Sequence, residues 1–146
     1  MGVERAVTEN APARAPVRVP GVWRCLAVLV AVRASLIALK FGRTVRLVRW
    51  VERCARTDRG VGPSTVEAIE RSVAMAAALF PGRALCLEQS LTLYVLLRLA
   101  GATVRLRLGV QAYPFGAHAW VEYLGRPLND IEEHVAFFAP LPDVLP

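Results

Sequence analysis

The sequence is poor in cysteine and histidine. Its 146 residues contain three cysteines, without regular spacing or a Cys-x-x-Cys pair, and only two histidines. An odd number of irregularly spaced cysteines excludes a disulfide framework, and so few nitrogen and sulfur ligands argue against a structural zinc site. We therefore expect no metal and no cofactor, and we expect Cys25 and Cys54 to be small apolar residues on helix faces. Disorder is excluded as well, because 55% of the residues are hydrophobic.

Long uninterrupted hydrophobic segments are also missing from the first half. The nearest approach to a membrane segment is Leu26–Leu39, but its unbroken apolar run, Leu26–Val32, has only seven residues. A membrane span needs roughly 20. Arg33 lies where the cleavage site of a signal peptide should be. The sequence therefore predicts a cytoplasmic protein, and it leaves a peripheral membrane contact of the first half open.

Acidic residues are scarce in the first part of the chain. Residues 1–60 hold 12 basic and 4 acidic residues, whereas residues 61–146 hold 6 basic and 8 acidic residues. Five arginines recur at steps of 3, 3, 4 and 3, which places them on one face of a helix: Arg43, Arg46, Arg49, Arg53 and Arg56. Such a stripe is usually a solvated face. The alternatives are an acidic peptide or carrier protein, to which Arg46 and Arg49 would bind, a membrane surface, or a nucleic acid, which we do not expect.

Apolar periodicity predicts helices in the first hundred residues. Three prolines predict a disordered tail over residues 1–20. Helices are predicted over residues 22–40, 43–57, about 64–80 and about 85–100, the last two ending at Pro81-Gly82 and at Gly101. Ser64 and Glu67 have the spacing of a capping box, which predicts the start of the third helix.

The apolar period then changes from 3.6 to 2. Residues 104–110 and 117–123 alternate as half-buried strands, and residues 127–131 are predicted to form a short third strand, followed by an irregular tail. The fold class is therefore α+β, with a small antiparallel sheet packed against the helix that starts near residue 86. We expect three parts: a tail (1–20), a helical arm (21–60) and a domain that carries the chemistry (61–146).

Cys86 begins the last predicted helix. The positive end of the helix macrodipole favours a thiolate there, and the free backbone N–H groups of a first turn can hold a developing oxyanion. Gln89 lies in the same turn and is a candidate oxyanion donor, whereas Glu88 is interpreted as a partner of the helix dipole.

His118 and Asp130 are predicted to face each other on neighbouring strands. A three-residue loop, Tyr123-Leu124-Gly125, would place them opposite one another, and a two-residue loop would break this pairing. A carboxylate that accepts a hydrogen bond from an imidazole fixes its tautomer and leaves the other nitrogen for a thiol. Trp120 shares the strand face of His118 and either shields the ring or packs in the core. His134 is expected at the surface.

Four segments together resemble one enzyme family: residues 86–91 (CLEQSL), 108–110 (LGV), 114–122 (PFGAHAWVE) and 127–130 (PLND). A cysteine on a helix, a histidine on a strand and an acid on the next strand follow the order of papain-like and transglutaminase-like folds. The AHAWVE stretch and its spacing resemble, more narrowly, the transglutaminase-like leader peptidase of lasso-peptide biosynthesis. The resemblance is dense over residues 82–131, looser over 22–80, and absent from the first 20 residues.

This resemblance implies a cysteine peptidase that cuts the leader from a ribosomally made precursor peptide. It assigns the catalytic triad to Cys86, His118 and Asp130. It also implies two partners: a separate leader-binding protein, because residues 1–60 do not look like a fused winged-helix domain, and an ATP-dependent cyclase similar to asparagine synthetase. Two other functions stay open, namely acyl transfer by the same triad to an amine and a non-catalytic basic scaffold for a precursor or a membrane.

Overall fold

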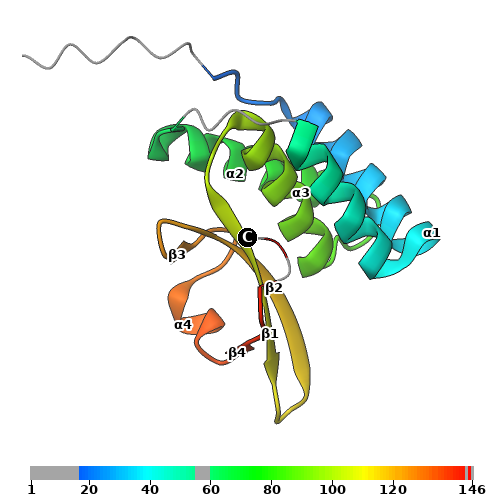
Figure 1. Ribbon diagram of the computed structural model, residues 1–146, viewed down its shortest axis with the longest axis vertical. Helices are drawn as coiled ribbons and strands as arrows, with labels where there is room; N and C mark the ends of the chain where they lie inside the picture. The colour runs from blue at the N-terminus through cyan, green and yellow to red at the C-terminus, as the bar shows by residue number, and fades with distance from the viewer. Residues whose placement is uncertain (1–16, 55–59, 144, 146) are drawn as a thin grey trace, which may run out of the picture.

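The structure is a computed structural model that describes residues 17–54, 60–143 and 145 (Figure 1). Most of the predicted tail lies outside these residues, as do residues 55–57 of the second predicted helix and Arg56. The described elements are, in chain order, α1 (Val22–Cys54), α2 (Pro63–Leu79), α3 (Cys86–Ala100), β1 (Val104–Gln111), β2 (Gly116–Tyr123), β3 (Arg126–Pro127), α4 (Glu132–Val135) and β4 (Ala139–Pro140). Helices followed by an antiparallel sheet confirm the predicted α+β class.

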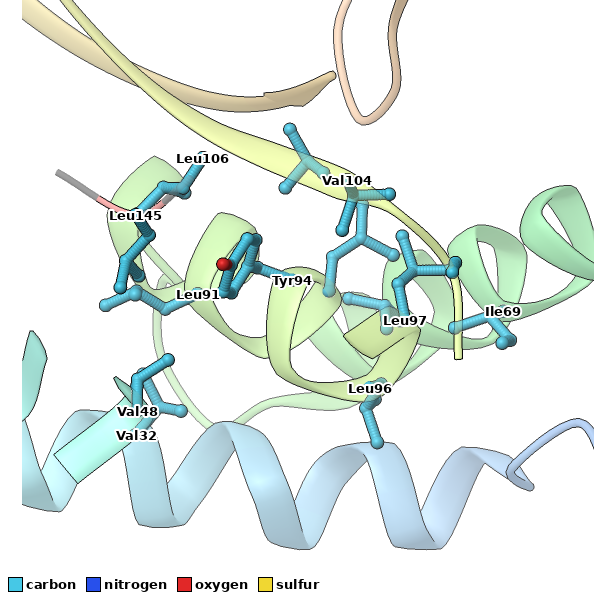
Figure 2. Packing of buried hydrophobic residues seen from close by; sticks show 14 of the residues in the cluster. Val32, Val48, Ile69, Leu91, Tyr94, Leu96, Leu97, Val104, Leu106 and Leu145 are labelled. Carbon is cyan, nitrogen blue, oxygen red and sulfur yellow. The ribbon is translucent and has the colours of Figure 1, made fainter. Parts of the chain in front are cut away.

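The helix α1 consists of two halves, residues 22–39 and 41–54, that fold back on each other at Lys40. The backbone of Lys40 is not helical, with φ 61° and ψ 169°. Arg33 of the first half contacts Glu88 near the start of α3, whereas Glu52 of the second half contacts Arg98 near its end. Val32 of the first half and Val48 of the second both belong to the buried core cluster (Figure 2). We call this element the α1 hairpin, and it matches the two helices predicted from the sequence.

The helix α3 lies between the α1 hairpin and the sheet (Figure 1). It is apolar on most sides, and Leu91, Leu93, Tyr94 and Leu97 are fully buried. Gly101 ends it in the left-handed conformation, with φ 92°, as a C-terminal glycine often does. In Figure 2, Leu106 lies toward the Leu91 end of α3 and Val104 toward the Leu97 end. The strand β1 therefore runs antiparallel to α3, and β2, which pairs antiparallel with β1, runs parallel to it.

The start of α2 differs from the prediction. Gly62 is the N-cap residue, no side chain caps the helix, and Pro63 occupies its first turn. Proline is well suited to that position because its missing N–H would have no partner there in any case. The helix therefore starts before Ser64, and the predicted capping box of Ser64 and Glu67 does not form.

The four strands form one antiparallel sheet in the order β3-β2-β1-β4. The predicted third strand, 127–131, is shortened to Arg126–Pro127, and the loop before it has two residues, Leu124 and Gly125, in place of three. Both have positive φ, of 50° and 79°, which is the requirement of a type I′ hairpin turn. Tyr123 consequently pairs with Arg126, so the predicted opposition of His118 and Asp130 in the ladder is wrong.

The C-terminal segment is more ordered than predicted. The short α4 follows β3, β4 pairs with β1 at the far edge of the sheet, and Leu145 forms an isolated bridge with Leu106. Leu145 is fully buried. The segment returns the chain over the face of the sheet that carries Gly109, where Phe138 and the ring of Trp120 lie closest.

Gly109 allows this close approach, and its substitution generates a first prediction. A Cβ atom at this position would lie 2.7 Å from Phe138 Cβ and 3.0 Å from the Trp120 ring. Overpacking of this kind costs about 1–3 kcal/mol. We expect Gly109→Ala to lower the free energy of unfolding by that amount in urea titrations. Gly42→Ala is the matched control, since its Cβ would meet nothing within 4 Å, and it should cause no loss. Equal stability of the two variants would contradict the packing described.

Candidate functional site

The structure brings His118 and Asp130 into direct contact. The Nε2 atom of His118 lies against the Asp130 carboxylate, and both side chains are largely buried, with 14% and 13% of their surface exposed. A carboxylate only accepts hydrogen bonds, so Nε2 carries the proton and Nδ1 of His118 is left for another partner. The contact predicted from the sequence is therefore present, although the strand register that predicted it is not.

Asn129 explains how the chain reaches this contact after β3 has ended. Leu128 donates its N–H to the Val121 carbonyl (2.7 Å), and the side chain of Asn129 then accepts from the Val121 N–H through Oδ1 (3.1 Å). The amide thus takes the place that a strand carbonyl would hold. Residues 128–130 form a bend, and Asp130 directly follows Asn129 in it. Asn129 is thus fixed to β2, and the residue after it, Asp130, contacts His118.

The same asparagine ties the loop to the helix α3. Its Nδ2 donates to Ser90 Oγ (2.9 Å), and the Ser90 hydroxyl donates to the Ala119 carbonyl (2.8 Å). Ser90 is fully buried. Three parts of the chain, α3, β2 and the segment that carries Asp130, are joined by these few hydrogen bonds. We call Ser90, Asn129 and their two backbone partners the Asn129 network.

His134 is a third member of the site that the sequence analysis placed at the surface. Its Nδ1 donates to the same Asp130 oxygen (2.7 Å), and its ring lies 5.0 Å from the ring of His118. About half of the His134 side chain is exposed. The i,i+4 spacing of Asp130 and His134 is the signal in the sequence from which this pair could have been expected.

Hydrogen bonds keep Asp130 ionised. Burial raises the pKa of this carboxyl, but the hydrogen bonds from His134, from the Ile131 N–H (2.8 Å) and from His118 outweigh burial and lower the pKa below its usual 3.8. A carboxylate that stays charged can stabilise an imidazolium on either histidine. The ligand atoms of the three side chains also lie within 4.8 Å of one another, a spacing that would allow a metal ion to be held.

Aromatic rings cover His118 on the protein side. Trp120 is buried and stacks with the imidazole at 6.0 Å between ring centroids and 19° between planes, and Phe138 lies at 5.1 Å. The Trp120 indole donates to Glu122 (3.3 Å). Trp120 thus both packs and shields the ring, and these were the two alternatives for it.

Cys86 is the first residue of α3 and is partly exposed. Ser90, one turn further, bonds to Ala119, and α3 runs parallel to β2, so Cys86 lies at about the level of His118. The Asn129 network thus ties α3, one turn after Cys86, to the strand that carries His118 and to the segment that carries Asp130.

The cysteine and the histidine are nevertheless not joined in the described residues: no hydrogen bond links the Cys86 sulfur to His118. The reason is that the His118 side chain lies on the face of β2 that points away from α3. Val121 and Leu106 point toward α3, whereas His118 points to the opposite face with Trp120 and Gly109. The structure therefore assembles the imidazole–carboxylate pair and places the thiol nearby without contact.

The first turn of α3 is stabilised by its own neighbours. Glu88 is buried, accepts from the Leu85 N–H (3.0 Å) and pairs with Arg33 (3.4 Å). Gln89 donates its side-chain amide to the Ala84 carbonyl (2.8 Å), so its predicted service as an oxyanion donor requires the release of this bond.

Arg46 and Arg49, the two predicted substrate-binding arginines, are exposed on the second half of the α1 hairpin. The helix α3 separates the α1 hairpin from the sheet, so the structure does not bring these arginines to the His118–Asp130 pair.

The Asn129 network generates a second prediction. Asn129→Ala would leave the buried Val121 N–H without an acceptor and would remove the donor to the buried Ser90 oxygen, which costs about 1–3 kcal/mol. We expect a loss of this size in the free energy of unfolding. Gln111→Ala is the control, because that amide bonds only to the nearby Tyr113 carbonyl (3.1 Å) in an exposed place. If Asn129→Ala were as stable as the control, the network would not hold the fold together.

The lowered pKa of Asp130 generates a third prediction, on acid stability. A carboxyl with a folded pKa below its usual 3.8 stabilises the fold well above that pH, and this contribution is lost as the pH falls through the folded value. The excess stability of the wild type over Asp130→Asn should therefore shrink as the pH is lowered from 6 to about 3. Chemical denaturation across this range measures it, and a constant difference would show that Asp130 is not held ionised by its neighbours.

Comparison with known proteins gives one match. A family model described as the transglutaminase-like superfamily matches residues 28–143, which is most of the chain and includes Cys86, His118 and Asp130. No curated protein and no solved structure matches the chain. Proteins of this superfamily are generally cysteine peptidases or acyltransferases. A match over this length, on a chain with a helix headed by a cysteine and packed on a sheet whose histidine contacts an aspartate, shows that the chain belongs to the transglutaminase-like superfamily.

Proposed function

We propose that this protein is a cysteine peptidase that removes the leader from the ribosomally made precursor of a lasso peptide. The observation that supports the proposal is the largely buried His118–Asp130 pair, on a strand and a segment that Ser90 and Asn129 tie to α3, the helix that begins with Cys86. The four sequence segments that resemble lasso-peptide leader peptidases fall on this same region: the start of α3, the strands β1 and β2, and the segment that leads to Asp130.

In the proposed reaction His118 acts through Nδ1, because Nε2 is engaged by Asp130. His118 takes the proton of the Cys86 thiol, and the sulfur attacks the carbonyl carbon of the scissile peptide bond. The oxyanion is stabilised by backbone N–H groups in the first turn of α3. The imidazolium then gives its proton to the leaving amine of the core peptide. Water, deprotonated by His118, hydrolyses the thioester and releases the leader with a free carboxylate.

The proposed reaction requires a rearrangement on substrate binding, because His118 points to the face of the sheet opposite α3 and Cys86 in the free protein. Catalytic hydrogen bonds are often absent or long in a free enzyme and form in the substrate complex. Four exposed apolar side chains lie close in the chain to the His118–Asp130 pair and can contact a peptide: Tyr113, Phe115, Ile131 and Phe137. In this proposal the leader is presented by a separate leader-binding protein, and the freed amine is the substrate of an ATP-dependent cyclase similar to asparagine synthetase.

Cys86→Ala tests the proposal and is the fourth prediction. Mass spectrometry of a lasso precursor incubated with the protein and the leader-binding partner should show leader and core as separate products, with one water added. Cys86→Ala should reduce cleavage at least about 1000-fold, since removal of a nucleophile leaves little activity. Cys54→Ala is the matched control, because Cys54 is exposed. Cys25 is a poorer control, since it is fully buried and burial raises the pKa of its thiol.

The same experiment separates hydrolysis from acyl transfer. If the leader were released as an amide of an added amine rather than as a free carboxylate, the protein would be an acyltransferase. Undiminished cleavage by folded Cys86→Ala would refute the assignment of the nucleophile. Iodoacetamide labelling adds a readout without the precursor. The Cys86 rate should fall in His118→Ala, while the Cys54 rate stays constant, if the imidazole reaches the thiol.

A further inference from the structure

The first half of the α1 hairpin exposes a line of apolar side chains. Trp23, Val30 and Ile37 recur every seven residues, with Ala27 and Ala34 between them, and all five are exposed. Trp23 and Ile37 are 77% and 74% exposed, which is unusual for large apolar residues in a folded chain. Residues three and four apart share a side of a helix, so the five form one continuous ridge. We call it the Trp23–Ile37 ridge.

The second half of the hairpin exposes basic and large apolar residues. Leu47 and Trp50 are exposed there, among the exposed side chains of Arg43, Arg46 and Arg53. At the reversal, where Lys40 adopts a backbone conformation that side-chain-bearing residues rarely use, the two halves border an open hollow of about 590 Å³. It is lined by Ala38, Leu39, Lys40, Gly42, Arg43 and Arg46.

Negative charge is missing from the exposed side of the hairpin. Its one acidic residue, Glu52, is mostly buried against Arg98 and the Tyr94 hydroxyl of α3. Arg33 pairs with Glu88. Within the α1 hairpin, residues 22–54, the basic residues that form no ion pair with an acid are Arg24, Lys40, Arg43, Arg46 and Arg53. The outer surface is therefore apolar and cationic at once.

An apolar and cationic surface fits one kind of binding partner better than the others. A second copy of the chain would bring arginines against arginines, so charge repulsion opposes self-association through this surface. An acidic peptide would neutralise the arginines but leave the Trp23–Ile37 ridge in water. A bilayer that contains anionic phospholipids satisfies both properties, because its acyl boundary accepts the ridge and its phosphates meet the basic residues.

We propose that the α1 hairpin docks the protein on the surface of an anionic phospholipid bilayer. The Trp23–Ile37 ridge would enter the boundary between headgroups and acyl chains, and Lys40, Arg43 and Arg46 would surround a lipid phosphate at the hollow. The element lies on the membrane and does not cross it. Although α1 has the length and composition of a spanning helix, as some core helices and signal sequences do, it reverses at Lys40 and packs its inner side on α2 and α3. The proposal is independent of peptidase activity.

Vesicle sedimentation tests it, with full-length protein and vesicles of phosphatidylcholine alone or mixed with phosphatidylglycerol. We expect binding to the mixed vesicles that weakens as salt rises, and little binding to phosphatidylcholine alone. Each basic residue near an anionic surface strengthens binding by about fivefold. Arg43→Gln combined with Arg46→Gln should therefore weaken binding to mixed vesicles about 25-fold. The matched charge control is Arg105→Gln with Arg126→Gln, which are exposed on the sheet and should change binding less than twofold.

The ridge has its own matched pair of variants. Trp23→Ser combined with Ile37→Ser should reduce vesicle binding by at least about tenfold, because each buried apolar side chain contributes to insertion. Met75→Ser with Leu79→Ser is the control, since these side chains of α2 are also more than half exposed and should leave binding unaltered. Circular dichroism checks that each variant remains folded.

Three outcomes would overturn the proposal. They are equal binding to neutral and anionic vesicles, unaltered binding by the folded ridge variant, and a concentration-dependent dimer without lipid that the ridge variant abolishes. Binding of an acidic peptide that depends on Arg43 and Arg46 but not on the ridge, without vesicle binding, would assign the surface to a peptide instead.

Discussion

The hydrogen bonds of Asn129 are the interaction on which the candidate site depends. One side-chain amide completes the pairing of Val121 after the third strand has stopped, and it also binds Ser90 on α3. Ser90 in turn bonds to the strand residue next to His118. The helix that begins with Cys86, the strand that carries His118 and the segment that carries Asp130 are therefore registered against one another by a single buried polar network. Substitutions in such a network are costly, because each lost hydrogen bond leaves a buried polar group without a partner and without access to water.

Asp130 is the electrostatic centre of the site. Its carboxylate accepts from two histidines and a backbone N–H, and these bonds hold it ionised in spite of burial. The bond from Nε2 of His118 fixes the tautomer of the ring and directs Nδ1 to a further partner, while Trp120 and Phe138 restrict its rotation. His134 adds a second imidazole on the exposed side, so the site can hold a positive charge at two positions.

The candidate site and the basic, apolar surface lie on different layers of the molecule. The sheet and α3 build the site, and the α1 hairpin covers the other side of α3 with Val32 and Val48 while leaving its own outer surface apolar and basic. The charge asymmetry between the two parts of the sequence thus has a spatial counterpart. The basic excess of the described first half lies on the layer farther from the sheet, where it cannot disturb the carboxylate that orients His118.

Periodicity in the sequence was sufficient to predict the helices, the two long strands and the α+β order, because burial of one face imposes a period of 3.6 or 2 on the chain. The glycine that ends α3 was predicted for a similar local reason. The proximity of His118 and Asp130 was also predicted, but from a strand register that the two-residue loop does not give; the hydrogen bond of Asn129 to Val121 brings Asp130 to His118 instead.

Turn geometry and the contacts between segments distant in the sequence could not be predicted from the sequence. The loop has two residues in place of the expected three, because Leu124 adopts the left-handed backbone conformation. The helix α2 begins at Pro63, so the expected capping box does not form. The role of His134 in the site depends on where α4 is held, and the separation of the Cys86 sulfur from His118 depends on which face of β2 meets α3. The sequence by itself determined the order of the helices and strands and the candidates Cys86, His118 and Asp130. Only the tertiary structure decided which of them touch, because contacts depend on register and on packing between distant segments, and a single change in loop length alters the register.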